Sequence, residues 1–110
     1  MAGEIKRDVA VVTVTADTVL ADATAVDIQQ YAGAVIFIPS GASSQVVTPY
    51  VAPTVGGTYL PLYDKSGTAI TYSVVASRAY DLHSAAFAGG GLKLVAATGD
   101  QAGITLSLKS

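Results

Sequence analysis

Along much of this chain, hydrophobic and polar residues alternate in short runs, and turn-forming residues separate one run from the next. In the last run, Ile104, Leu106 and Leu108 alternate with polar residues, which is the period of a strand with one buried face. The most hydrophobic run, residues 34–38, ends at a Pro-Ser-Gly sequence and indicates a central strand. Residues 9–14 are apolar on both faces and rich in valine, a pattern typical of a well-buried strand.

Further strands are predicted at residues 24–29, 45–51, 58–63, 68–75, 78–82 and 92–96. Pro49 interrupts one of them, and because proline cannot donate to a ladder, we expect that segment at a sheet edge or a bend. The Asp-Lys-Ser-Gly sequence at residues 64–67 predicts a hairpin turn. Residues 84–88 are the best candidate for a helical turn, which the glycines at 89–91 would close.

Eight or nine short strands with at most one helical turn predict an all-β fold, an antiparallel β-sandwich of jelly-roll-like type. At 11.1 kDa the chain is long enough for one hydrophobic core. We therefore expect a single domain over residues 9–110. Residues 1–8, which hold four of the charges, are expected to form an N-terminal arm or a frayed terminus.

Charged residues are scarce, at 13% of the chain, about half the share of an ordinary soluble domain. Small β-proteins normally place Lys and Glu along sheet edges, where they prevent pairing with neighbouring molecules. The shortage predicts a surface that other protein covers, as in a homo-oligomer or a lattice. A compact and unusually apolar monomer is the alternative.

Several classes of partner and site do not fit the composition. The six basic residues are scattered, whereas nucleic-acid binders cluster them on one face, and an anionic membrane needs the same clustering. No run of about 20 apolar residues could span a bilayer. The chain has no cysteine for a disulfide or a thiolate metal site. No apolar segment follows the N-terminal Lys-Arg pair, so we expect synthesis and folding in a cytoplasm.

The single histidine, His83, is the first residue to consider for catalysis, with Asp81 and Ser84 as its near neighbours. Residues one or two apart in an extended segment point in different directions, so these three cannot form a triad by themselves. A surface or capping role for His83 is the simpler interpretation. We expect no enzyme activity and no cofactor.

Asp17, Asp22 and Asp27 recur at a spacing of five residues, which raises the question of calcium. Calcium needs six to eight oxygens, usually from one tight loop, and strand-like residues separate these carboxylates. They are interpreted as turn and strand-end residues, and no metal site is expected. The glycines at 89–91 precede a strand and not a helix, so they predict a turn or a close backbone approach and not a phosphate site.

Five of the six tyrosines lie within one stretch of the chain, at positions 50, 59, 63, 72 and 80. Tyrosines on a β-face can stack on sugar rings, which would fit a carbohydrate-binding module or an adhesin domain. Tyrosine is also a favoured residue of protein interfaces, because its ring is apolar and its hydroxyl tolerates a wet rim. A role in the core or in a subunit interface is the preferred interpretation.

Residues 58–68 (TYLPLYDKSGT), 74–82 (VVASRAYDL) and 92–95 (LKLV) together resemble small β-rich structural proteins of tailed bacteriophages. The likeness covers roughly residues 57–109 and consists of strand and turn patterns. It implies a non-enzymatic virion protein that binds a capsid or tail surface as a symmetric oligomer. A trimer is favoured, because capsids offer three-fold sites.

The leading hypothesis is therefore a capsid decoration, or cement, protein on the virion surface, with the major capsid protein or another virion protein as its partner. A tail or head-fibre component is the alternative within virions. The apolar segment over residues 50–62 and the N-terminal arm are the predicted contact surfaces. Their candidate interface residues are Glu4, Lys6, Arg7, Tyr50, Tyr59, Leu60 and Leu62.

Overall fold

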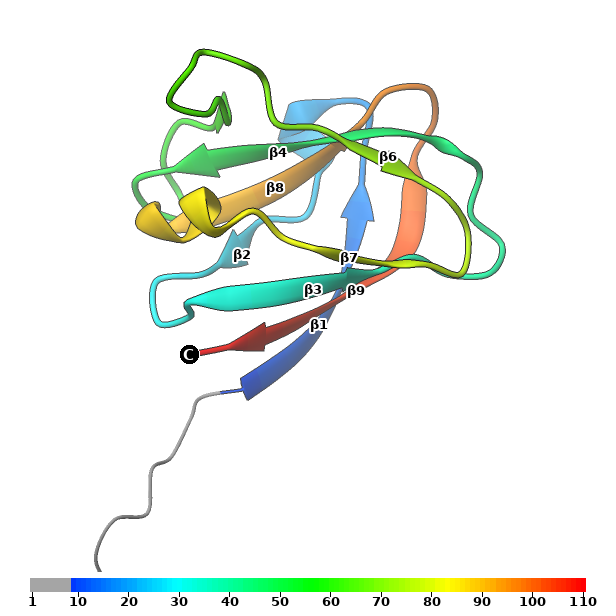
Figure 1. Cartoon of the computed structure of the whole chain (residues 1–110), viewed down its shortest axis with the longest axis horizontal. Helices are drawn as coiled ribbons and strands as arrows, with labels where there is room; N and C mark the ends of the chain where they lie inside the picture. The colour runs from blue at the N-terminus through cyan, green and yellow to red at the C-terminus, as the bar shows by residue number, and fades with distance from the viewer. Residues whose placement is uncertain (1–8) are drawn as a thin grey trace, which may run out of the picture.

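Two antiparallel sheets pack face to face in the computed structural model, which describes residues 9–110 apart from the side chains of residues 84 and 85 (Figure 1). Over these described residues the chain forms nine strands and two short 3₁₀ turns, η1 (Leu20–Asp22) and η2 (Ser84–Ala88). The predicted all-β sandwich is confirmed. Of the two 3₁₀ turns, η2 was predicted and η1 was not. The predicted N-terminal arm, residues 1–8, lies outside the described residues.

Sheet A contains, in spatial order, β1 (Val9–Ala16), β9 (Gln101–Lys109), β3 (Gly33–Phe37) and β7 (Ala79–Asp81). Sheet B contains β2 (Val26–Asp27), β8 (Gly91–Ala96) and β4 (Gln45–Ala52), and the far side of β4 pairs with β5 (Leu60–Pro61) and β6 (Tyr72–Val74). The two sheets meet at one corner. There the backbone carbonyl of Asp17, the residue after β1, accepts a hydrogen bond from the amide of Ala96 at 3.0 Å.

The core between the sheets is entirely aliphatic in its largest members, which alternate along their strands as period-2 patterning requires. The largest fully buried side chains include Ile28, Ile36, Leu82, Leu92, Ile104, Leu106, Leu108, Val47 and Val74. No polar or charged side chain is buried within residues 9–110, leaving aside those of residues 84 and 85. The predicted alternation of the last strand is confirmed, since its three aliphatic residues all lie in this core.

The predicted burial of residues 9–14 on both faces is wrong. β1 lies at the edge of sheet A and pairs only with β9 among the described strands. Its odd-numbered residues face outward, so Val9 is 65% and Val11 71% exposed. The apolar pattern predicts two covered faces, but only the inner face of β1, which carries the buried Val14, packs on the core.

Pro49 also contradicts its prediction, because it lies inside β4, which has neighbours on both sides, and it is buried. Its carbonyl accepts a hydrogen bond from the amide of Leu62 at 3.1 Å, so its nitrogen points to the same side, away from β8. On that side Leu62, the residue just after β5, lies opposite Pro49. The Leu62 carbonyl, to which Pro49 has no amide to donate, accepts the amide of Ile70 at 3.0 Å instead, so this acceptor is satisfied.

The glycines before β8 confirm the predicted close backbone approach. Gly90 donates to the carbonyl of Ala52 at 2.8 Å, and an added Cβ there would overlap the backbone of Pro53. At Gly91 an added Cβ would overlap the Tyr59 phenol. The loop that follows β4 thus packs on the outer side of sheet B, and Tyr59 covers β8 at its first residue.

Candidate functional site

The surface most open to a partner is the outer face of sheet A. It has no covering element among the described residues, and the strand register defines three rows of side chains on it. One row contains Val11, Ser107, Val35 and Asp81, in that order across β1, β9, β3 and β7. The flanking rows contain Val9, Lys109 and Gly33 on one side and Thr13, Thr105, Phe37 and Ala79 on the other.

Two strands of this face, β1 and β3, expose large apolar side chains, and polar residues of β9 lie between them. On β3, Val35 is 37% and Phe37 45% exposed, and the β1 valines described above are more exposed still. Several large apolar side chains on one sheet face are typical of surfaces that bind protein, whereas single exposed residues are common on any protein. The outer face of sheet A therefore has the chemistry of an interface.

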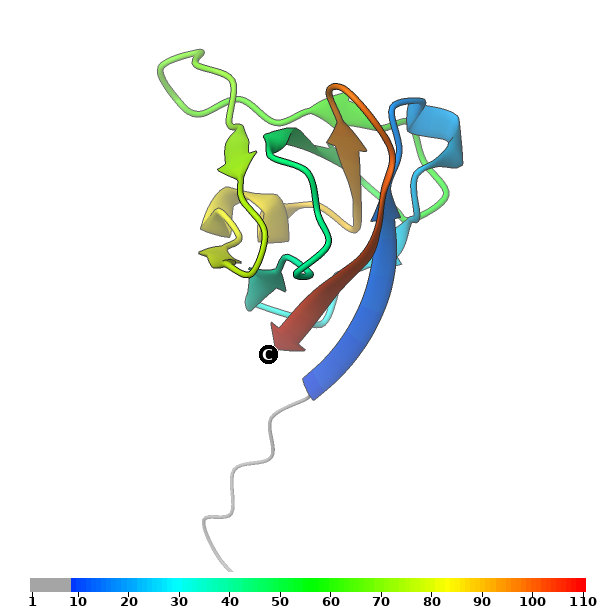
Figure 2. The same cartoon turned by 90° about the vertical axis from the view of Figure 1, so that its right-hand side faces the viewer.

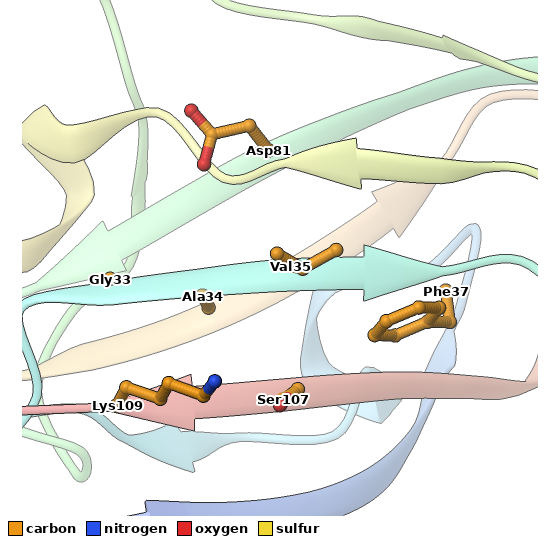
Figure 3. Close-up of a pocket in the computed structure, with 7 residues that line it drawn as sticks. All are labelled: Gly33, Ala34, Val35, Phe37, Asp81, Ser107 and Lys109. Atoms are coloured by element: carbon orange, nitrogen blue, oxygen red, sulfur yellow. The ribbon is translucent and has the colours of Figure 1, made fainter.

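A shallow hollow of about 300 Å³ opens in this face beside Gly33, which has no side chain to fill it (Figure 3). Val35 and Phe37 line it on β3, and Ser107 lines it on β9. Lys109 and Asp81 lie at its margins, on β9 and β7, the two strands that flank β3. An apolar side chain from a partner could fill the hollow while the two opposite charges stay at its wet rim.

Charge is confined to the ends of strands on this face. Asp81 and Lys109 are the last residues of β7 and β9, and the other positions on the face are uncharged among the described residues. A charge at the rim costs little to keep in water, whereas one at the centre would have to lose its hydration when a partner docks. The placement of charge leaves the centre of the face ready for apolar contact.

The outer side of sheet B is covered in part by the loop that carries Tyr59, which is only 8% exposed. The Tyr59 hydroxyl donates to the carbonyl of Val55 at 2.7 Å, and the Lys93 ammonium lies 5.0 Å from the centre of its ring. Lys93 Nζ also donates to the carbonyl of Leu20 at 3.0 Å. Burial raises the pKa of the Tyr59 phenol above its ordinary value, and the charge of Asp27 adds to the rise.

The structure places the predicted interface residues in separate regions. Glu4, Lys6 and Arg7 lie outside the described residues. Tyr50 is half-buried on β4, and Tyr59 is the buried residue described above. These residues remain predictions as partner contacts, and the structure does not unite them in one surface.

Leu60 and Leu62 do come together. Both line a hollow of about 450 Å³ with Val51, Pro53 and Thr58 at one end of sheet B. Leu60 is 62% exposed, whereas Leu62 is half-buried against the core. This hollow is the part of the predicted contact surface that is apolar and open.

The tyrosines do not form a common platform. Tyr72 and Tyr80 pack edge to face with ring centres 6.4 Å apart, and both hydroxyls accept backbone hydrogen bonds, from His83 and Val75 respectively. Burial raises the pKa of Tyr72; the bond from the His83 amide lowers it, and Asp81 raises it further. Of the five tyrosines at residues 50–80, only Tyr63 is largely exposed.

Two of the three aspartates considered for calcium, Asp17 and Asp27, serve local turns. Asp17 Oδ1 accepts the amide of Val19 at 2.8 Å, and Asp27 Oδ1 accepts that of Gln29 at 3.0 Å. In the predicted hairpin turn, Asp64 Oδ1 accepts two amides in the same way. Across the described part of the chain, no group of three or more His, Cys, Asp or Glu residues could hold a metal ion. Over the same residues, no helix is long and apolar enough to cross a bilayer.

Sequence reasoning missed the outer face of sheet A as a candidate site. Its signal was present, because β1 and β3 are both apolar on two faces in a chain with little charge. What the pattern could not indicate is that both uncovered faces belong to the same sheet. Comparisons with protein-family models, with curated proteins and with solved structures found no match for this chain.

Proposed function

We propose that this protein is a non-enzymatic structural component of a tailed-phage virion and docks on the capsid through the outer face of sheet A. The support is the set of exposed apolar side chains on that face, Val11 on β1 and Val35 and Phe37 on β3. The phage assignment depends on the resemblance of residues 57–109, and the low charge of the chain agrees with a surface that protein covers.

The proposed mechanism is physical. A subunit that bridges adjacent capsid proteins buries area only in the assembled shell, so by mass action its binding favours the intact particle. Three strand spacings of about 4.8 Å and four residue rises of about 3.4 Å give the face a flat area of roughly 200 Å². A specific interface needs about 800 Å² per partner, so one face alone would bind weakly and many copies would act through avidity.

The test is binding of the purified protein to heads of the phage that encodes it, measured by co-sedimentation and located by electron microscopy. Val35→Lys puts a charge at the centre of the face and should weaken binding by about tenfold to a hundredfold, since a buried valine contributes about 1.5–3 kcal/mol. Val46→Lys is the matched control, because Val46 is 39% exposed on a strand of sheet B. It should bind like the parent protein.

Equal binding by the two variants would refute docking through sheet A. Binding to tails and not to heads would favour the tail or head-fibre alternative, and binding to neither would refute the virion assignment. The dispersed tyrosines offer no support for a carbohydrate platform, so we do not propose one.

A further inference from the structure

In the part of the chain that the structure describes, β1 leaves one long edge of sheet A unpaired. Figure 2 shows the strand at the margin of the sheet beside β9, and among the described residues no strand pairs with its other side. The sequence of β1, Val-Ala-Val-Val-Thr-Val-Thr-Ala, contains no charge, proline or glycine. Proteins normally protect an edge with one of these, and a long uncharged edge is a template for another strand.

The hydrogen bonds around β1 show which of its backbone groups face the edge. The Thr15 amide donates to Thr24 Oγ1 at 3.0 Å, and the Thr15 carbonyl accepts the amide of Thr24 at 3.3 Å, so Thr15 faces away from β9. Backbone groups alternate along a strand, so those of Val9, Val11 and Thr13 also face the edge. The register shift near Thr15 does not disturb this alternation, because the extra residue lies on β9.

An independent bond supports the same assignment. On β9 the Lys109 carbonyl accepts the amide of Ala32 at 2.9 Å, on the side of β3. The even-numbered residues of β9 must then face β1, where Leu108 is paired with Ala10. Ala10 and its even-numbered neighbours thus use their backbone groups on β9, and the odd-numbered ones remain for the edge.

We propose that two copies of this chain pair antiparallel along β1, with the two-fold axis at Val11. Thr24 already occupies the groups of Thr15, so the open row consists of residues 9, 11 and 13. An axis at Val11 pairs Val9 with Thr13 of the partner copy and Val11 with itself. Every residue of the open row then exchanges hydrogen bonds, about six in all, and the two sheets become one.

The side chains on both faces of β1 suit this register. On the outer face, the most exposed valine of the strand, Val11, meets its own copy at the axis. On the inner face, half-buried Ala10 would lie opposite Val12 of the other copy, beside a hollow of about 360 Å³ that both residues line with Tyr31. Pairing would extend the core across this opening.

A second copy is the occupant that the strand itself specifies, because the open row is short, uncharged and complementary to itself under a two-fold rotation. The contact goes beyond the proposed docking function and does not depend on it. It also joins two outer faces of sheet A on one side of a continuous sheet, which doubles the small docking area of a single copy. The isologous contact closes at two copies, so it competes with the trimer that the resemblance implies.

The first experiment measures the mass of the full chain by sedimentation equilibrium between 1 and 100 µM, a range of about two decades chosen to bracket typical dimer affinities. The parent protein should have twice the 11.1 kDa monomer mass. Val11→Pro removes an edge-facing amide and no bond to β9, so the fold should remain by circular dichroism. It should raise the dimer dissociation constant about a hundredfold, since two bonds across the axis are lost. Val35→Lys, on β3, should leave the dimer unchanged.

The second experiment tests the register with single cysteines, which is simple because the chain has none. Val11→Cys should form a disulfide between copies under mild oxidation, because paired Cα atoms lie about 5.5 Å apart, within disulfide range. Val9→Cys is the matched control at similar exposure, with its counterpart about 14 Å away, so it should not cross-link with itself. A mixture of Val9→Cys with Thr13→Cys should form the mixed disulfide.

A folded monomer at 100 µM, a trimer, or a dimer that Val11→Pro leaves intact would each overturn the proposal. Cross-linking of Val9→Cys as fast as Val11→Cys would overturn the register. Loss of head binding by Val35→Lys in a protein that stays dimeric would support docking and leave the dimer standing, so the two proposals fail separately.

Discussion

Gly90→Ala should be among the most destabilising single-methyl additions in this protein. Gly90 lies between η2 and β8 and is buried. Its amide donates to the carbonyl of Ala52 at 2.8 Å, and its carbonyl accepts the amide of Ile28 at 3.1 Å. One residue thus joins the end of β4 to the segment that follows β2.

The magnitude follows from what the added methyl group would meet. A Cβ at Gly90 would overlap the Pro53 carbonyl group and lie 3.0 Å from Thr54 Cα. These are backbone atoms, so no change of rotamer relieves the clash. Overpacking costs about 1–3 kcal/mol, and displacing the loop weakens two hydrogen bonds of about 1 kcal/mol each. We expect a loss of about 3 kcal/mol, or roughly 12 °C in Tm.

The assay is urea unfolding followed by circular dichroism, with the free energy obtained by linear extrapolation. Gly99→Ala is the control, because a Cβ there meets nothing within 4 Å and the residue has no positive φ. All variants must be compared at one protein concentration, since self-association would add to apparent stability. If the two alanine variants agree within about 0.5 kcal/mol, the close approach of the loop to Gly90 is refuted.

Three further outcomes are expected. Gln45→Ala should lower the free energy of unfolding by about 2 kcal/mol in the same urea assay, because the Gln45 side chain makes hydrogen bonds of 2.9 to 3.3 Å with residues 98–99. Gln101→Ala is the control and should lower it little, because the Gln101 side chain makes one exposed bond, to its neighbour. Burial raises the pKa of Tyr59 and of Tyr72 in the folded protein. Their contribution to stability is therefore fully present below the unfolded phenol pKa of about 10, and the free energy of unfolding should fall as the pH rises above that value. Replacing both tyrosines by phenylalanine should flatten that decline, and an equally steep decline in the double variant would refute the assignment.

The sequence predicted the fold where local pattern and tertiary environment agree. The alternation in the last strand has one explanation, a face on the core, and the structure has that face fully buried. The hairpin turn at residues 64–67 forms because Asp64 Oδ1 accepts the amides of Ser66 and Thr68, and Gly67 takes a φ of 81°. The turn depends on contacts within a few residues, and the strand carries its buried face in its own alternation, so a sequence pattern can predict both.

The errors concern which neighbour a strand has, and pattern alone does not contain that information. Residues 9–14 have the composition of an interior strand, yet β1 occupies an edge. Pro49 has the chemistry of an edge residue, yet it lies inside sheet B, because two short strands divide the far side of β4 between them. In both cases the deciding fact is the order of strands in the sheet, which depends on pairings distant in sequence.

The same limit explains why low charge indicated an interface but not its location. Several of the charged residues that the structure describes, such as Asp64, Lys65 and Asp100, lie outside the strands. The faces of the sheets receive few of them, and sheet B hides part of its outer side beneath the loop around Tyr59. Among the described residues no such loop covers sheet A, so its outer face and the β1 edge remain as exposed apolar surfaces. A partner on these two surfaces would remove their apolar side chains from water. We therefore assign docking to the outer face of sheet A and self-pairing to the β1 edge.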